Sequence, residues 1–370
     1  MTAVRKKVCI ILQPIITALS ASIALANPLP DTLPLMDSDS GAYYTPYIIY
    51  TEEKRTPGTI LLPLNFIINS AFDSAQVPLA FKQAAYFKKF KTVFNRTINP
   101  VRSIERDGGF SKFFRDEWAT TRSIPNYMMH VVGGGYDFRM IAEWYQYHRF
   151  PIPYFFSFLT CYAAHFSNEA LETSNRALTS HDHIADLYFF DVVGKLMFIN
   201  DSVARFFHRE LQMRTWMGQP MFDVRRARIY NAATNYAMRP FIFRKDIRFF
   251  FLFGYHYLGG FGFRVNNTDF LTISAGVCVI KGFDPDRQKT ASQSVKNFRT
   301  CGGIFYDRNG SLLASIIING TENYRVRLNI YPDLLHFGDV NFGVFAAYDD
   351  HNRIAFGFSM YGLLGLSVTL

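Results

Sequence analysis

The feature that most constrains the fold is a period of two in the last third of the chain. From residue 246 onward, apolar side chains alternate with polar or small ones, as in strands that have one apolar face. The alternation reaches the terminus, with large apolar side chains at Leu364, Leu366, Val368 and Leu370. Soluble proteins rarely end on an uncovered apolar strand. Outer-membrane barrels commonly do, usually on an aromatic residue, because their last strand pairs with the first. The pattern therefore favours the outer membrane of a Gram-negative bacterium.

Turn signals divide this region at regular intervals. They are Gly259–Gly260, Asn266–Asp269, Asp307–Gly310, Asn319–Gly320 and Asp349–Asn352. Their spacing predicts about eight antiparallel strands over residues 246–370, closed or nearly closed into an outer-membrane type of β-barrel. One strand face carries apolar rows and the other carries arginines and small residues, so we expect lipid outside and polar groups inside. A soluble sandwich or lipocalin-like barrel gives similar alternation and stays open as an alternative.

The first residues of the chain have the pattern of a secretory signal. Three basic residues at positions 5–7 precede an apolar stretch that begins at Val8, and Ala24-Leu25-Ala26 provides small residues before Asn27. This order predicts a signal peptide over residues 1–26 and a mature protein that begins at Asn27. An uncleaved membrane anchor is the alternative for this segment. A periplasmic location is the alternative to the outer membrane.

Composition indicates which classes of binding partner the protein is suited to and which type of membrane protein it resembles. The net charge is +9, which suits acidic lipid head groups or lipopolysaccharide. The basic residues form no stripe that would follow phosphates, so we expect no nucleic-acid partner. Aromatic residues make up 17% of the chain, and no stretch of about 20 apolar residues follows the signal, which favours a barrel over a helical membrane protein.

Three cysteines remain beyond the signal, at Cys161, Cys278 and Cys301. Three widely spaced thiols form neither a disulfide framework nor a zinc site. A bridge between Cys278 and Cys301 on neighbouring strands and two buried, reduced side chains are both compatible with the sequence.

The region 27–245 has helical periodicity and is expected to be mainly helical. The expected helices include 81–94, 111–121, one that begins near Ile124, an antiparallel pair at 154–175 and 184–199, and a continuation over 202–230. We expect the aromatic stripe of the 81–94 helix to be core or to pack on the barrel, rather than to anchor the protein at a membrane surface. Because an eight-stranded barrel has room only for side chains, the helices should lie beside or beneath it.

Segment 120–200 gathers ionisable residues into apolar helices. They are Asn126, His130, Arg139, Glu169, Glu172 and Asp186. Carboxylates in such a place must be paired, hydrogen-bonded or protonated. We therefore expect Glu169 and Asp186 to approach one another, or to share His130 or Arg139, in a salt-bridged structural cluster.

Two other functions have less support from the same residues: a catalytic site and a metal site. A hydrolytic or lipid-modifying site would use His130 as a base with a carboxylate to orient it, so the catalytic candidates are His130, Glu169, Glu172 and Asp186. For a metal, Glu169, Glu172, His181 and His183 are suitable ligand types, but His181-Asp182-His183 is expected in an exposed loop. We expect no metal and no cofactor. The glycines at 133–135 lack the Lys-Ser/Thr of a phosphate loop and indicate close helix packing.

The order of these residues resembles a family of Gram-negative envelope proteins known only as a domain of unknown function. The matching residues, within 120–200, are Asn126, His130, Gly133, Tyr136, Arg139, Glu169, Glu172, Asp186 and Gly194. Val131 stands where the family usually has proline, and Asn168 where it usually has an aromatic residue. The resemblance implies an envelope location and a following barrel, with no established activity.

Together these patterns predict an outer-membrane-associated protein of a structural or interaction type, with lipid or lipopolysaccharide as its partner. The alternative is a membrane-embedded enzyme that acts on lipid or lipopolysaccharide.

Overall fold

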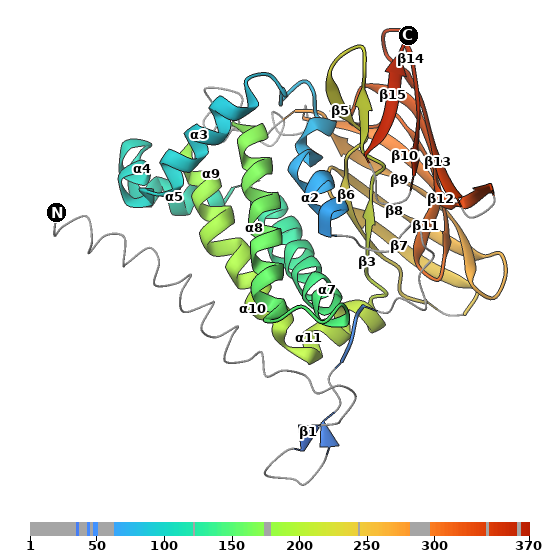
Figure 1. Cartoon of the computed structure of the whole chain (residues 1–370), viewed down its shortest axis with the longest axis horizontal. Helices are drawn as coiled ribbons and strands as arrows, with labels where there is room; N and C mark the ends of the chain where they lie inside the picture. Colours follow the sequence, from blue (N-terminus) through green and yellow to red (C-terminus); the bar gives the residue numbers. More distant parts are fainter. Residues whose placement is uncertain are drawn as a thin grey trace.

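A computed structural model of the chain places a helical region beside a curled β-sheet (Figure 1). The structure describes residues 35–36, 43–44, 47–50, 63–120, 123–173, 179–242, 245–281, 297–337, 340–360 and 364–370. The predicted signal peptide, 1–26, and its cleavage site lie outside the described residues. The α+β class and the order of its two parts are confirmed.

The helical part extends from α2 to η6, after a two-residue hairpin of β1 (Leu35–Met36) and β2 (Tyr43–Tyr44). Its elements are α2 (Pro63–Ala71), η3 (Asp73–Gln76), α3 (Tyr86–Thr97), α4 (Pro100–Arg106), α5 (Gly109–Trp118), α6 (Ser123–Pro125), η4 (Asn126–Gly133), α7 (Gly134–Tyr147), α8 (Pro153–Glu172), α9 (Ser180–Ala185), η5 (Asp186–Phe190), α10 (Asp191–Ile199), α11 (Asp201–Arg205) and η6 (Phe206–Glu210). Segments α6, η4 and α7 form one continuous helix, and α9, η5 and α10 form another. Among the described helices, none is both long and apolar enough to cross a lipid bilayer.

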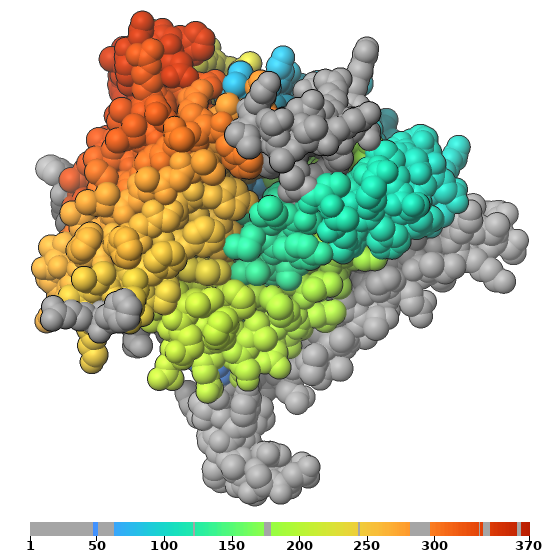
Figure 2. All heavy atoms as spheres, turned by 180° about the vertical axis from the view of Figure 1, so that it is seen from behind, coloured from blue at the N-terminus to red at the C-terminus, as the bar shows by residue number. Residues whose placement is uncertain are grey.

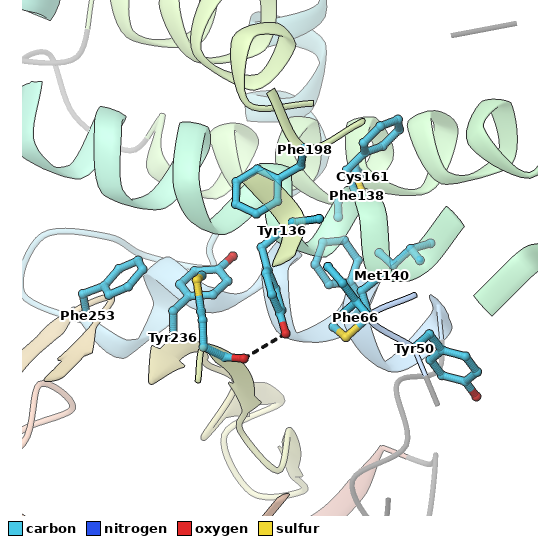
Figure 3. Packing of buried hydrophobic residues seen from close by; sticks show 14 residues of the cluster. Tyr50, Phe66, Tyr136, Phe138, Met140, Cys161, Phe198, Tyr236 and Phe253 are labelled. Carbon is cyan, nitrogen blue, oxygen red and sulfur yellow. Dashed lines mark hydrogen bonds between the residues drawn. The ribbon is translucent and has the colours of Figure 1, made fainter. Parts of the chain in front are cut away.

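The core of the helical part joins it to the sheet. Tyr136 of α7 packs among buried aromatic side chains that include Phe198 of α10 and Phe253 of the sheet. Its hydroxyl donates a hydrogen bond to the carbonyl of Met213, 2.9 Å away (Figure 3). A second buried bond, from the Tyr236 hydroxyl to Asp137 at 2.7 Å, also links sheet to helix. Seen from behind, the teal helices and the yellow and orange strands form adjoining parts of one surface (Figure 2).

Glycines permit close approach of the two long helices, as predicted. A Cβ built on Gly135 would lie 2.5 Å from the carbonyl oxygen of Gly194. A Cβ on Gly194 would in turn lie 2.7 Å from the carbonyl oxygen of His130 and would also meet that of Val131. Both obstacles are backbone atoms, which cannot move aside as a flexible side chain can.

We therefore expect Gly194→Ala to destabilise the helical part by roughly 1–3 kcal/mol, because the added methyl group would push α10 away from η4. The measurement is the midpoint of urea unfolding followed by tryptophan fluorescence. Gly259→Ala is the control, since a Cβ there meets nothing within 4 Å. Equal midpoints for Gly194→Ala and the control would contradict the packing argument.

Within the described residues, thirteen strands form the main sheet, in the order β3-β6-β7-β8-β9-β10-β11-β12-β13-β14-β15-β4-β5. Their bounds are β3 (Arg214–Met217), β4 (Met221–Asp223), β5 (Arg228–Tyr230), β6 (Thr234–Met238), β7 (Ile247–Phe253), β8 (His256–Arg264), β9 (Asp269–Val279), β10 (Phe298–Arg308), β11 (Ser311–Ile318), β12 (Tyr324–Phe337), β13 (Val340–Asp349), β14 (Ile354–Met360) and β15 (Gly365–Thr369). Neighbours are antiparallel except β15 and β4, which are parallel. The predicted closed barrel of about eight strands is therefore wrong, and the observed sheet is open and curled.

The sheet begins at Arg214, earlier than the change of pattern near residue 245, and the helix expected over 202–230 ends at Glu210. Gly218 and Pro220 interrupt the helical pattern there. On either side of these two residues the chain forms β-strands instead. Strand β3 pairs with β6 toward one end of the sheet, and β4 pairs with β15 toward the other end. The segment 214–223 therefore contacts both ends of the curled sheet.

The two faces of the sheet differ in chemistry. We call the side that is exposed the outer face, and its apolar residues are 36–55% exposed. They are Phe249, Phe261, Phe263, Leu271, Ile273, Ile304, Ile318, Val326, Ile354, Phe356, Phe358, Met360 and Leu366. Alternate positions face inward and are buried; their polar members include Thr272, Ser274, Asp307, Ser315, Arg327, Asn329, Ser359 and Ser367.

The inner face holds polar networks beside an aromatic cluster. The Gln219 side chain donates to the carbonyl of Ile330 at 3.0 Å and accepts from the Ser359 hydroxyl at 2.6 Å. Trp216 packs on Phe305 nearby. Side chains therefore fill the inside of the curl, and the helices lie beside the sheet rather than within it, as predicted (Figure 1).

Two smaller expectations have different outcomes. All three cysteines in the described residues, Cys161, Cys278 and Cys301, are free and buried, so of the two possibilities left open the structure has the reduced one. The aromatic stripe of α3 is not core, because Phe87 is 86% exposed and Phe94 is also exposed. The helix turns Val93 and Thr97 toward its neighbours, and of its stripe Phe90 packs on Phe166 of α8, with 4.8 Å between ring centroids.

Candidate functional site

Seven ionisable side chains meet where three helices of the helical part pack together. We call this set the histidine–carboxylate cluster: His130, His165, Glu169, His183, Asp186, Asp191 and Lys195. His130 comes from η4 and Asp186 from η5, and both of these segments are π-helical. π-Helical turns interrupt regular hydrogen bonding and occur frequently at functional sites. His165 and Glu169 lie on α8, one turn apart.

Asp191 is the centre of one half of the cluster. Its Oδ1 lies 3.0 Å from His130 Nδ1, and its Oδ2 lies 2.6 Å from His165 Nδ1 and 2.9 Å from Lys195 Nζ. Burial raises the pKa of this carboxyl, but the charges of His165 and Lys195 and the histidine hydrogen bonds hold it well below its usual range. Asp191 is therefore a carboxylate that orients two imidazoles and neutralises a buried ammonium group.

His130 faces carboxylates through both ring nitrogens. Its Nε2 lies 3.5 Å from Asp186 Oδ2, opposite the Nδ1 contact with Asp191. One ligand atom from each of His130, Glu169 and Asp186 lies within 4.8 Å of the other two. Burial lowers the pKa of His130, but the bond to Asp191 and the charges of Asp191 and Glu169 raise it overall. The ring is 18% exposed, so a ligand from outside can reach it.

Glu169 is held from its other side by His183, whose Nδ1 lies 2.6 Å from Glu169 Oε2. His183 Nε2 lies 3.2 Å from an Arg96 guanidinium nitrogen. The same nitrogen lies 3.1 Å from the Thr173 hydroxyl oxygen. His183 therefore orients the Glu169 carboxylate and is itself positioned by Arg96 and Thr173.

The structure brings together three of the six residues expected in one polar cluster: His130, Glu169 and Asp186. Asn126 lies one turn before His130 and donates to the backbone oxygen of Glu117 at 3.2 Å.

Arg139 and Glu172 are elsewhere, which corrects that part of the expectation. Arg139 binds Glu143 at 2.5 Å and Asp201 at 2.8 Å. Nine residues separate it from His130, which is about two and a half helical turns and places it on the opposite face. Glu172 accepts from the Tyr255 hydroxyl of the sheet at 2.9 Å.

The expected exposed loop at His181-Asp182-His183 is wrong. These residues form the start of α9, and all three are buried. The His181 ring packs edge-on against Phe113, 5.5 Å between centroids, and only His183 of the two histidines reaches Glu169. Within the described residues, neither His181 nor Glu172 belongs to a group that could hold a metal ion.

Sequence reasoning did not include three members of the cluster in the site: His165, Asp191 and Lys195. A spacing signal was present, because His165 and Glu169 are four residues apart, as are Asp191 and Lys195. Residues at this spacing share a helix face. Asp191 also lies within a turn and a half of Asp186, so the argument that placed Asp186 near His130 applied to Asp191 as well.

Chemically, the arrangement provides an imidazole oriented by one carboxylate and facing two others. Such a group can transfer a proton, or it can bind a cation together with the carboxylates. No protein-family model, curated protein or solved structure matches this chain. The resemblance to an envelope family therefore stays a prediction, and function has to be argued from the residues alone.

Proposed function

We propose that this protein is an outer-membrane-associated protein of a structural or interaction type, with the outer face of its sheet in lipid and its helical part packed against one side. The observation that carries the proposal is the outer face itself. Phe356 and Phe358 are 47% and 54% exposed, and exposed apolar or aromatic side chains occupy nine consecutive strands, β7 to β15, with Tyr348, 37% exposed, on β13. Soluble monomers rarely expose contiguous apolar surface on this scale.

The placement of charge supports the same proposal. A soluble barrel would turn its charges outward, but here ion pairs are buried on the inner side, including Arg239–Asp307 at 2.5 Å and Arg327–Glu322 at 2.8 Å. This distribution is that of a sheet whose surroundings are less polar than its interior. The partner that fits the outer face is the acyl region of lipid or lipopolysaccharide.

Helix α3 provides further support. Its exposed residues Phe87, Phe90 and Phe94 share one face, next to Lys88 and Lys91. An aromatic stripe beside lysines is typical of helices that lie in the membrane interface. The proposal therefore has the helical part resting on a membrane surface.

Cell fractionation tests the location. We expect the mature protein to be recovered with the outer membrane, and its gel mobility to change on heating, because a sheet held in lipid or detergent resists unfolding by detergent at low temperature. The control is a periplasmic marker protein released by osmotic shock. Recovery of the protein together with that marker would contradict the proposal.

A second candidate is a membrane-embedded enzyme that acts on lipid or lipopolysaccharide. The observation in its favour is His130, which is partly exposed and oriented by Asp191 like a general base. The test compares lipid and lipopolysaccharide profiles of strains with and without the gene. A changed profile that wild type and His148→Ala restore, but His130→Ala does not, would favour the enzyme. His148 is an exposed histidine at the end of α7, outside the cluster. Identical profiles would exclude the enzyme.

A further inference from the structure

We propose that His130, Glu169 and Asp186 bind one divalent first-row transition-metal ion, of the class of Zn²⁺ or Mn²⁺. The ligands would be His130 Nε2, one carboxylate oxygen of Asp186 and one of Glu169. An imidazole and two carboxylates are a ligand set that zinc and manganese accept. Calcium and magnesium prefer oxygen ligands only, so they should bind this site more weakly.

The geometry needs little rearrangement. The three ligand atoms lie within 4.8 Å of one another, and His130 Nε2 and Asp186 Oδ2 are 3.5 Å apart. Ligand atoms at about 2.0–2.2 Å from a tetrahedral ion are separated from each other by about 3.3–3.6 Å. Small rotations of the Glu169 and Asp186 side chains therefore complete the site. Three protein ligands would leave a position for water or a substrate group.

The surrounding hydrogen bonds have the pattern that metal sites use to orient their ligands. Asp191 holds the far nitrogen of His130, Nδ1, at 3.0 Å, which directs Nε2 toward Asp186. His183 holds one oxygen of Glu169 at 2.6 Å and leaves the other for the ion. A carboxylate behind a ligand histidine, and a donor behind a ligand carboxylate, are the usual outer partners of metal ligands.

Charge gives the second argument. Glu169 and Asp186 are both buried, and carboxylates this close repel one another. A divalent cation between the two carboxylates would remove this repulsion.

The two π-helical segments are the third argument. His130 belongs to η4 and Asp186 to η5, two of the three π-helical segments in the described residues, while Glu169 comes from the regular helix α8. Two separate helices thus depart from regular geometry at the same place. A shared ligand between them accounts for this coincidence, since π turns occur frequently at functional sites.

Two other groups of suitable residues are weaker candidates. In His130, His165 and Asp191, the Lys195 ammonium lies 2.9 Å from a carboxylate oxygen and would repel an ion there. In Glu169, Asp182 and His183, both ring nitrogens of His183 already have partners, Glu169 and Arg96.

The test measures how much zinc the mature protein binds in detergent micelles. Metal is first removed with a chelator, and bound zinc is then determined by equilibrium dialysis and elemental analysis. We expect one equivalent in wild type and in the control His148→Ala. His130→Ala, Glu169→Gln and Asp186→Asn should each weaken binding by more than about tenfold. Far-UV circular dichroism confirms that each variant is folded. No zinc in wild type at micromolar free zinc, or equal binding in all three variants, would overturn the proposal.

A second measurement needs no variant. Pulsed electron paramagnetic resonance of wild-type protein loaded with Mn²⁺ detects nitrogens that coordinate the ion. We expect one imidazole nitrogen, that of His130, and no loss of the signal when excess Ca²⁺ or Mg²⁺ is added. Two imidazoles or none would overturn the ligand set. Metal binding at these residues does not require the membrane location, so each proposal can fail without the other.

Discussion

Asp191→Ala is expected to lower the free energy of unfolding by roughly 3–5 kcal/mol, because it removes one partner of a buried ion pair and leaves the other charge uncompensated. Asp191 is 1% exposed, and its partner Lys195 is almost as deeply buried. The same substitution removes the hydrogen bonds to His130 and His165. The measurement is urea unfolding in lipid vesicles, followed by circular dichroism.

Two further variants test whether the loss of stability comes from leaving a buried charge unpaired. Asp350→Ala removes a carboxylate from an exposed pair with Arg299, at 3.2 Å, and should change stability by less than about 1 kcal/mol. The double variant Asp191→Ala, Lys195→Met should recover part of the loss, since no ammonium group is then left unpaired. A loss as small as that of Asp350→Ala would contradict the account of the cluster.

Phe356→Arg is the second substitution with a large expected effect. Phe356 lies on the outer face of β14, opposite Ala346 of β13 and Val368 of β15. If that face is in lipid, an arginine there should destabilise the folded protein by roughly 2–4 kcal/mol, depending on depth. In water the same half-exposed position would tolerate arginine to within about 0.5 kcal/mol. The quantity measured is the folding equilibrium in vesicles as a function of urea.

The control for this substitution is Asn267→Arg, in the exposed turn between β8 and β9. It adds the same charge outside the apolar surface and should leave the folding equilibrium unchanged. If Phe356→Arg is as neutral as Asn267→Arg, the outer face is not in lipid and the proposed function is wrong.

The sequence predicted the long strands well and the short ones badly. Strands β9 and β14 have enough residues to show a period of two, and their exposed and buried faces follow it. Strands β3 and β4 have four and three residues, too few for any period, and only their pairing partners at the ends of the sheet reveal them. For this reason the predicted number of strands and the predicted closure of the sheet were wrong.

Residue spacing predicts which side chains share a face of one helix. It does not predict which faces of neighbouring helices pack together. Glu169 and Asp186 could be placed together because a short connection makes α8 and the next long helix antiparallel neighbours. Residue types alone do not show which face of a helix meets which neighbour, and this led to the wrong inclusion of Arg139. The π-helical turns, which rotate His130 and Asp186 relative to a regular helix, have no signal in the sequence that we can identify.

The central claim is that the outer face contacts lipid, and fluorescence quenching at introduced cysteines tests it most directly. The three described cysteines are buried, so a label on Ile273→Cys or Phe356→Cys reacts selectively. In vesicles, we predict that quenchers attached to lipid acyl chains reduce the fluorescence at both positions and that aqueous iodide does not. A label at Asn267→Cys should show the reverse. Quenching of the labels at positions 273 and 356 by iodide, with no effect of the lipid quenchers, would contradict the account.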